Sequence, residues 1–342
     1  MFKKSNVLVT GGASFIGSHL VEKLVQLGAK VRVVDDLSSG KLENLSLVSA
    51  EIEFLKLDLR DSHSADLATK DIDIVFHLAN IHGGRGFIET HPGEICQNFL
   101  IDGNVFYQSH RNGVNRICYT SSACAYPTNL QGYDSEQRVR YLSEEMANPF
   151  VAGSALADGE YGWAKFMGEM ALRSYNTQFG QKGVSCRLFT VYGPRENESH
   201  AIIAFIAKAL ARQEPFEIWG SGQQDRNFTY VDDIVDGLIL SVESIDDCRS
   251  VNIGTDEITR IVDAVNLVCR IVDYDPENYF FDTTKPEEVL ARAASVSNQI
   301  SWLGWSPSIR FAEGIKKTVD WYRGSRTDAE IRDAISNKLF DR

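Results

Sequence analysis

The chain has 342 residues, of which 43% are hydrophobic, and this is enough apolar sequence for a sizeable core in one or two domains. It carries 35 lysines and arginines against 47 acidic residues, so its formal charge of −12 has the wrong sign for a nucleic-acid-binding protein. No apolar run is long enough to span a bilayer. We therefore expect no nucleic-acid partner and no membrane, and an anionic ligand would need locally placed arginines.

The six cysteines are scattered along the chain, with no Cys-x-x-Cys pair and no zinc-type histidine spacing. This usage is typical of a reducing compartment and predicts no metal site. The apolar run 7–10 is too short for the hydrophobic region of a signal peptide. We expect a soluble, cytoplasmic protein.

Short β-branched runs alternate with amphipathic stretches over the first 120 residues. Near-continuous apolar strands separated by helices indicate a parallel sheet covered on both faces. The predicted strands are residues 7–9, 31–34, 54–57, 74–78 and 117–119. The stretch after Gly17 has helical spacing and ends at Gly28, a predicted C-cap. The expected fold class is α/β, a doubly wound parallel sheet of the Rossmann type.

The second half of the chain has a different character. Residues 129–158 are polar and contain Gly and Pro, which predicts a long loop or flap beside the site. A helix is predicted at 92–112, before this loop. After it, the sequence predicts helices at 162–179, at 201–211 and after Asp233, and strands at 184–191 and 216–219. We expect residues 1–190 to bind a dinucleotide and residues 191–342 to form mainly a smaller substrate-binding lobe, with an approximate boundary and interleaved lobes.

A glycine-rich turn follows the first predicted strand and opens the first predicted helix, as a dinucleotide fingerprint requires. Its cofactor-facing residues are Gly11, Ser14, Phe15, Ile16 and Gly17, with the pyrophosphate at the helix N-terminus. Ser14 stands where a middle glycine is usual, so the backbone approaches the phosphates less closely.

Acidic and apolar residues at the ends of the next strands complete the predicted cofactor site. Asp35 lies 18 residues after Gly17, where a carboxylate binds the adenosine ribose and repels a 2′-phosphate, and this predicts NAD over NADP. Asp58 and Leu59 are placed to bracket the adenine, and Leu78 is a further contact. A surface aspartate that caps a turn is the alternative for Asp58.

A second group of residues contains candidates for proton transfer. Tyr161 precedes Lys165 by four residues, which places both on one helix face, where the ammonium can lower the phenol pKa and hold a ribose. Cys124, in the run TSSACAYP, offers a softer base near the same centre.

A series of motifs along nearly the whole chain resembles, in identity and order, that of an extended short-chain dehydrogenase/reductase, and more narrowly that of a nucleotide-sugar epimerase. They are the glycine turn, Asp35, Asp58, HLA 77–79, Asn98, the Ser-Ser run, Tyr161 with Lys165, RLF 187–189, YGP 192–194, RNFTYVDD 226–233 and NIG 252–254. The resemblance implies that Ser122 and Tyr161 contact the sugar C4 hydroxyl, that Lys165 holds the nicotinamide ribose of tightly bound NAD, and that Asn98 lies near the catalytic helix.

Two local features narrow the resemblance. Residues 83–88 and 121–127 resemble GDP-mannose 3,5-epimerase, whereas YGP followed by SHAII 199–203 resembles GDP-fucose synthase, whose epimerising pair is a cysteine and a histidine. The resemblance implies transient oxidation at C4, with Cys124 as the base at C3 or C5 and His200 as the proton donor from the other ring face. The alternatives are a small buried hydrophobe for Cys124 and a solvated helix-start residue for His200.

The resemblance also assigns substrate contacts. Arg226 and Arg292 match positions that clamp a pyrophosphate, for which a guanidinium fork is suited, although a surface arginine is the alternative for Arg292. Gly84 and Arg85 are placed near the sugar. The expected partner is a nucleotide-diphosphate sugar, with GDP favoured, and the helices at 92–112 and 162–179 either pair in a homodimer or pack only on the sheet.

Several activities stay open. The favoured one is epimerisation of a GDP-hexose at C3 or C5; a 4-epimerase of the UDP-sugar type would use only Ser122, Tyr161 and Lys165. An NAD(P)H-consuming 4-keto-sugar reductase and a catalytically silent NAD sensor are further alternatives. Dehydratases of this superfamily carry Asp-Glu where this chain has Ala123-Cys124.

Overall fold

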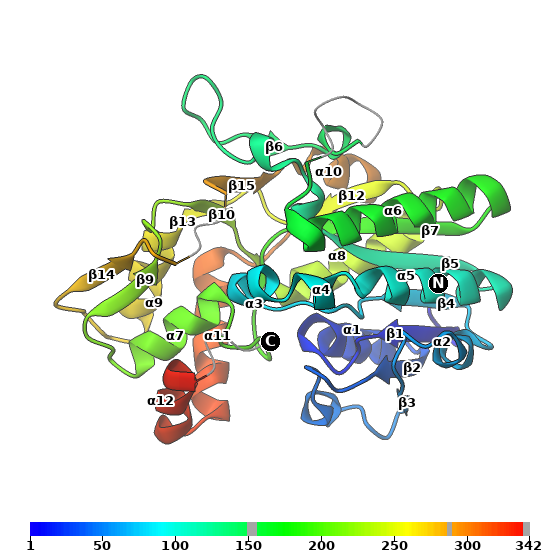
Figure 1. The fold of residues 1–342 in the computed structure, drawn as a ribbon. Helices are drawn as coiled ribbons and strands as arrows, with labels where there is room; N and C mark the ends of the chain where they lie inside the picture. Colours follow the sequence, from blue (N-terminus) through cyan, green and yellow to red (C-terminus); the bar gives the residue numbers. More distant parts are fainter. Residues whose placement is uncertain (149–155, 286–288, 338–342) are drawn as a thin grey trace.

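The computed structural model describes residues 1–148, 156–285 and 289–337. Its largest element is a seven-stranded, all-parallel sheet with the strand order β12-β7-β5-β4-β1-β2-β3 (Figure 1). The strands are β1 (Asn6–Thr10), β2 (Lys30–Asp35), β3 (Ile52–Lys56), β4 (Ile74–His77), β5 (Arg116–Ser122), β7 (Lys182–Leu188) and β12 (Ser250–Ile253). The predicted doubly wound α/β class is confirmed.

Helices cover both faces of this sheet. Helices α1 (Phe15–Gln26) and α8 (Val231–Ser244) pack together on one face, while α2 (Ser62–Thr69), α5 (Asn98–Arg111) and α6 (Gly159–Phe179) cover the other. Successive residues of β1 point to opposite faces: Val7 and Val9 belong to one apolar cluster and Leu8 to the other. Burial on both faces explains the near-continuous apolar strands.

The helix after the glycine turn ends close to the predicted stop. Leu27 is the C-cap of α1, and Gly28 follows it with a φ of +79°. Glycine is favoured in this left-handed conformation because it lacks a Cβ.

Two predicted elements are divided in the structure. In place of one helix over 92–112 there are two, α4 (Pro92–Ile95) and α5, because Gln97 and Phe99 donate to the carbonyls three residues earlier and tighten the turn between them. The strand predicted at 184–191 ends at Leu188 as β7, and the separate strand β8 (Val191–Tyr192) pairs with β11 (Thr229–Tyr230).

A second lobe lies beside the carboxyl ends of the parallel strands (Figure 1). Its own apolar cluster is built from helices and strands between residues 191 and 335. The helices are α7 (Ala201–Leu210), α9 (Ile261–Ile271), α11 (Phe311–Ser325) and α12 (Asp328–Asn337). Strand β9 (Phe216–Trp219) contributes to the cluster, and the lobe also contains β10 (Asp225–Asn227), β13 (Ile258–Arg260), β14 (Tyr279–Asp282) and β15 (Ala291–Ala294).

The chain crosses between the lobes more than once. Strand β12 returns to the edge of the large sheet, next to β7, and α10 (Ser297–Leu303) packs against it and α8. Conversely β6 (Tyr141–Leu142), from the predicted loop 129–158, pairs with β15 in the four-stranded sheet β13-β10-β15-β6. Residues 149–155 of that loop lie outside the described residues.

Two kinds of feature are absent from the described ranges. No helix there is long and apolar enough to cross a membrane. No group of three or more His, Cys, Asp or Glu residues there is arranged to hold a metal ion.

Candidate active site

A cavity of about 1020 Å³ lies between the carboxyl ends of the parallel strands and the second lobe. It brings together all but one of the site residues predicted from the sequence. Those that line it are Gly11, Ser14, Phe15, Ile16, Gly17, Asp35, Asp58, Leu59, Leu78, Gly84, Arg85, Ser122, Cys124, Tyr161, Lys165, His200, Arg226 and Arg292.

The glycine turn forms one end of this cavity. Gly11 has a φ of +69°, and a Cβ placed there would lie 2.9 Å from the amide nitrogen of Ala79. A Cβ on Gly17 would lie 2.2 Å from the carbonyl oxygen of Gly11. Only glycine allows the turn to close this tightly, and Ser14 then forms the N-cap of α1 with the amides of the first helical turn beside the cavity.

The carboxylate of Asp35 lies beside this turn. It is 4% exposed and accepts hydrogen bonds from the backbone N–H groups of Leu37 at 2.9 Å and Ala13 at 3.0 Å. Burial raises the pKa of Asp35, and these two hydrogen bonds oppose the rise. Asp58 is more exposed and pairs with Arg60 at 2.7 Å, a hydrogen-bonded contact that lowers the pKa of Asp58.

This end of the cavity fits NAD. The cradle at Gly11 and Gly17 leaves no room for side chains, the amides at the start of α1 suit a pyrophosphate, and Asp35 is an acceptor that suits two ribose hydroxyls.

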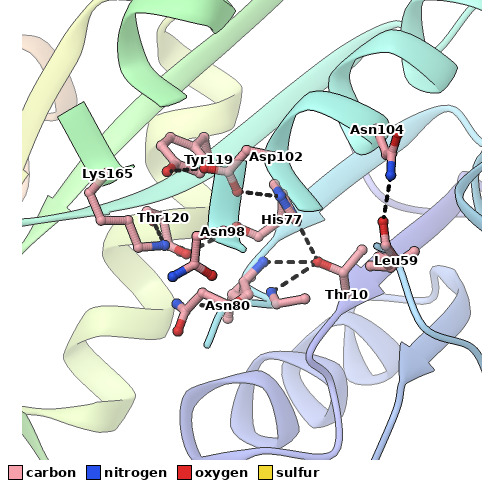
Figure 2. A network of polar contacts seen from close by, with 12 residues as sticks. Thr10, Leu59, His77, Asn80, Asn98, Asp102, Asn104, Tyr119, Thr120 and Lys165 are labelled. Carbon is pink, nitrogen blue, oxygen red and sulfur yellow. Dashed lines mark hydrogen bonds and ion pairs between the residues drawn. The ribbon is translucent and has the colours of Figure 1, made fainter. Parts of the chain in front are cut away.

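A buried polar network fixes the strand ends beneath the site (Figure 2). The Thr10 hydroxyl accepts from the amides of Leu78 and Ala79 and lies 2.7 Å from Nδ1 of His77, while Nε2 of His77 lies 3.0 Å from Asp102. With two amides donating to it, the Thr10 hydroxyl gives its own proton to Nδ1, so Nε2 of His77 donates to Asp102. The network therefore ties β1, β4 and α5 together next to the glycine turn.

Lys165 and Asn98 lie near this network but act differently. Lys165 Nζ donates to the carbonyl oxygen of Thr120 at 2.9 Å, and Lys165 lines the cavity. Asn98 is 1% exposed and is the one predicted site residue outside the cavity lining. Its side chain bonds both the N–H and the C=O of Ile81, so it holds the loop after β4 in place.

The electrostatics of Tyr161 differ from the prediction. Burial raises the pKa of Tyr161, the nearby Cys124 raises it further, and a hydrogen bond from Ser122 lowers it in part. The predicted lowering by Lys165 is wrong for this arrangement, because the ammonium points to the Thr120 carbonyl and lies 5.9 Å from the Tyr161 ring centroid. Burial also lowers the pKa of Lys165.

Cys124 is held close to α6 by backbone contacts. Its N–H donates to the Ser122 hydroxyl at 3.1 Å, and its carbonyl accepts from the N–H of Asp158, which precedes α6, at 2.9 Å. A Cβ on Gly162 would lie 2.2 Å from the same carbonyl oxygen. Gly162 therefore allows the turn that carries Cys124 to approach the helix that carries Tyr161.

Two arginines meet at Asp158 beside this cysteine. Arg292 contacts Asp158 at 2.8 Å, Gln131 at 2.6 Å and Sγ of Cys124 at 3.5 Å, and Arg85 reaches Asp158 at 3.1 Å. Arg292 is 7% exposed, so the alternative of a surface arginine is wrong. Arg226 is its register partner on the neighbouring strand β10. Asp158 was missed in the sequence because its partners are distant along the chain.

His200 is the N-cap residue of α7 and lines the cavity with two residues that the sequence analysis missed. Its Nδ1 lies 3.2 Å from Oε1 of Glu196, and its ring stacks on His82 with centroids 5.3 Å apart. The ring of His82 is in turn 5.0 Å from that of Tyr161. The four-residue spacing of Glu196 and His200, and a histidine directly before Gly83-Gly84, are the signals in the sequence that could have identified them.

Comparison with known proteins gives the family. A family model described as "NAD dependent epimerase/dehydratase family" matches residues 7–254. The chain belongs to this family. GDP-mannose 3,5-epimerase 1 of Oryza sativa subsp. indica is 31% identical over 326 residues, covering 94% of this chain and 82% of the relative.

Solved structures agree with this assignment. The UDP-glucose 4-epimerase of Thermotoga maritima, determined with UDP-glucose, has a TM-score of 0.81 at 30% identity and covers 94% of this chain and 99% of its own. The UDP-glucose 4-epimerase of Thermus thermophilus, in complex with NAD, has a TM-score of 0.80 at 26% identity and covers 94% and 100%. The protein is accordingly an isomerase of the epimerase type, it uses NAD, and the predicted resemblance to extended short-chain dehydrogenases/reductases is confirmed.

Proposed function

We propose that the protein epimerises a GDP-hexose at C3 or C5, after transient oxidation at C4 and before re-reduction. The observation that carries the proposal is the position of Cys124. Its thiol lies in the same cavity as Tyr161 and 3.5 Å from the guanidinium of Arg292, a cation that favours the reactive thiolate. A simple 4-epimerase has no use for a base at this place.

The oxidation at C4 follows from the residues at the nicotinamide end. The glycine turn and Asp35 would hold NAD, which when bound would supply a reversible acceptor for the C4 hydride. Tyr161 removes the proton of the C4 hydroxyl, Ser122 orients that hydroxyl, and Lys165 holds the ribose. The resulting C4 ketone acidifies the neighbouring C–H bonds at C3 and C5.

The proton exchange uses the two walls of the cavity. Cys124 takes the proton from C3 or C5 on one face of the ring, and His200 delivers a proton to the other face, which inverts the centre. Arg226 and Arg292, side by side on β10 and β15, are placed for the substrate's charged groups, and Gly84 and Arg85 for its sugar. In this proposal residues 1–190 supply the cofactor site and residues 191–342 most of the substrate-binding lobe.

Isotope exchange tests the proposal directly. The purified protein, without added cofactor, is incubated with GDP-mannose in deuterium oxide, and we expect deuterium at C3 or C5 together with an epimerised product. Cys124→Ala should lose this exchange while bound NAD is still reduced transiently by the substrate. Unchanged exchange in Cys124→Ala would falsify the role of the cysteine.

A 4-epimerase acting on a UDP-sugar is the second candidate. The 30% identity with the Thermotoga maritima enzyme favours it, and it would require only Ser122, Tyr161 and Lys165. UDP-glucose in the same experiment distinguishes the two: conversion to the C4 epimer without deuterium incorporation, equally in Cys124→Ala, would select the 4-epimerase. Asp35, which repels a 2′-phosphate, argues against an NADPH-consuming reductase.

We also propose a cytoplasmic homodimer. Exposed apolar side chains gather on the outer surfaces of the paired helices α5 and α6, namely Phe99, Leu100, Tyr107, Trp163 and Met167. Light scattering should give twice the mass of the chain, and Leu100→Glu combined with Met167→Glu should give a folded monomer. The free thiols of Cys96, Cys118, Cys186, Cys248 and Cys269 support a reducing compartment.

A further inference from the structure

His200 belongs to a compact group of three side chains. Glu196 lies four residues before it, in the segment that leads into α7, with Oε1 3.2 Å from Nδ1 of His200. His82 comes from the loop after β4 and stacks on the His200 ring at an interplanar angle of 21°. The close packing of this loop on the His200 segment is fixed by Gly84, where a Cβ would lie 2.4 Å from the carbonyl oxygen of Ser199.

Glu196 is unusual among the carboxylates of the cavity wall. It is 5% exposed, and within the described residues its Oε2 accepts no hydrogen bond. Burial raises the pKa of Glu196 well above its ordinary value, and a hydrogen bond from the Gly193 backbone opposes the rise. The nearest imidazole nitrogen to this carboxyl group is Nδ1 of His200, at 3.2 Å from Oε1.

The other charged groups around His200 have partners of their own. The pairs are Arg195 with Glu22 at 2.6 Å, Glu198 with Arg326 at 2.8 Å, Arg85 with Asp158 at 3.1 Å and Lys208 with Glu217 at 3.0 Å. The titratable rings and thiol that face the same space are those of His82, Tyr161 and Cys124. Glu196 is therefore the carboxyl group that pairs with His200 itself.

We propose that Glu196 and His82 are positioning residues that make His200 a directed proton donor. Oε1 of Glu196 lies 3.2 Å from Nδ1, so the carboxylate pairs with His200 when the ring is protonated and favours Nε2 as the nitrogen that acts on the sugar. His82, stacked between His200 and Tyr161, fixes the ring plane and, since two stacked imidazolium rings repel each other, restricts this wall to one cation. The inference rests on the proposed function for its substrate but not for its geometry.

The proton step then balances. The Nε2–H bond of the His200 imidazolium breaks and its electron pair stays on nitrogen, while the electron pair of the substrate enolate forms the new C–H bond. His200 becomes neutral and Glu196 keeps its place at Nδ1. Solvent restores the proton, and the proton taken by Cys124 returns to solvent, so the enzyme ends as it began.

Two measurements test the inference. In the protein without substrate, NMR of the histidine rings should show His200 and His82 titrating as a coupled pair, and Glu196→Gln should move the His200 midpoint lower by about one pH unit. In deuterium oxide with GDP-mannose, Glu196→Gln should keep isotope exchange and transient NAD reduction, but the rate of inversion should fall about tenfold. In the pH profile of that rate, the alkaline limb should move to lower pH. Glu196→Asp should restore part of both effects, and His82→Phe, which keeps the stacked ring, should leave His200 with a single titration step.

An unchanged His200 midpoint in folded Glu196→Gln would overturn the inference. So would an inversion rate and profile that match the parent enzyme. If the parent enzyme shows no exchange with any hexose, the proposed function fails while the NMR result still decides the coupling of Glu196, His82 and His200.

Discussion

The guanidinium of Arg292 lies 3.5 Å from the thiol of Cys124, although 168 residues separate them in the chain. We predict that Arg292→Gln displaces the isotope exchange to higher pH, because the cation that stabilises the thiolate is lost. At pH 7 the rate should fall by about tenfold for each unit of displacement. Exchange rates between pH 6 and 10 measure it, and Arg292→Lys, which keeps the charge, is the matched control. If the pH profiles of exchange coincide for Arg292→Gln and the parent enzyme, the prediction is contradicted.

Tyr161 gives a second pH-dependent prediction. Because burial raises the pKa of Tyr161, only a small fraction is phenolate between pH 6 and 9, so the rate of NAD reduction by substrate should rise about tenfold per pH unit over this range. Tyr161→Phe should reduce the rate by about 10²-fold to 10⁴-fold and abolish the slope. Stopped-flow absorbance of the reduced nicotinamide measures both quantities. A flat profile in the parent enzyme would mean that another group is the base.

Asp35 should determine the choice of cofactor. Its carboxylate is held by the amides of Ala13 and Leu37 beside the glycine turn. In Asp35→Asn the repulsion of a 2′-phosphate is removed, so the preference for NAD over NADP should fall by about tenfold or more. Calorimetric titration of the cofactor-free protein with both dinucleotides gives the ratio. Asp58→Asn, at a more exposed carboxylate paired with Arg60, should change it little.

The contact between Gly162 and the carbonyl of Cys124 predicts a steric effect. Alanine at Gly162 would place a Cβ 2.2 Å from that oxygen, so the turn must move away from α6 at a cost of about 1–3 kcal/mol in the free energy of unfolding. Denaturant unfolding measures the loss. Gly324→Ala in α11, where nothing lies within 4 Å of the new Cβ, is the matched control and should be neutral or slightly stabilising. Equal stability of the two variants would refute the steric argument.

The sequence predicts those parts of the site that are local in the chain. The glycine turn, Asp35 and the Tyr161–Lys165 spacing each follow from a few neighbouring residues, and the structure brings all of them to one cavity. The contact of Arg292 with Asp158 spans 134 residues and depends on β15 packing beside the turn of Cys124, which no local pattern encodes.

The electrostatic error at Tyr161 has a related cause. Helical spacing correctly places Lys165 on the same face, but the ammonium is directed by the Thr120 carbonyl, which belongs to another element. At the point where the predicted helix 92–112 is divided, Asn98 at the start of α5 is likewise bonded to another element, the Ile81 backbone. Pattern and spacing therefore predict which elements exist, whereas partners across elements decide how their side chains are charged and aimed.

The return of β12 to the large sheet has a consequence for biosynthesis. As the ribosome releases the chain from its N-terminus, six strands of the large sheet emerge by residue 188, yet the seventh is made only at residues 250–253. Strand β6 stays unpaired for longer, because its neighbour β15 begins only at Ala291. The nascent polypeptide therefore leaves the ribosome with an incomplete sheet edge, and the cavity is completed only after β15, which carries Arg292, has been made.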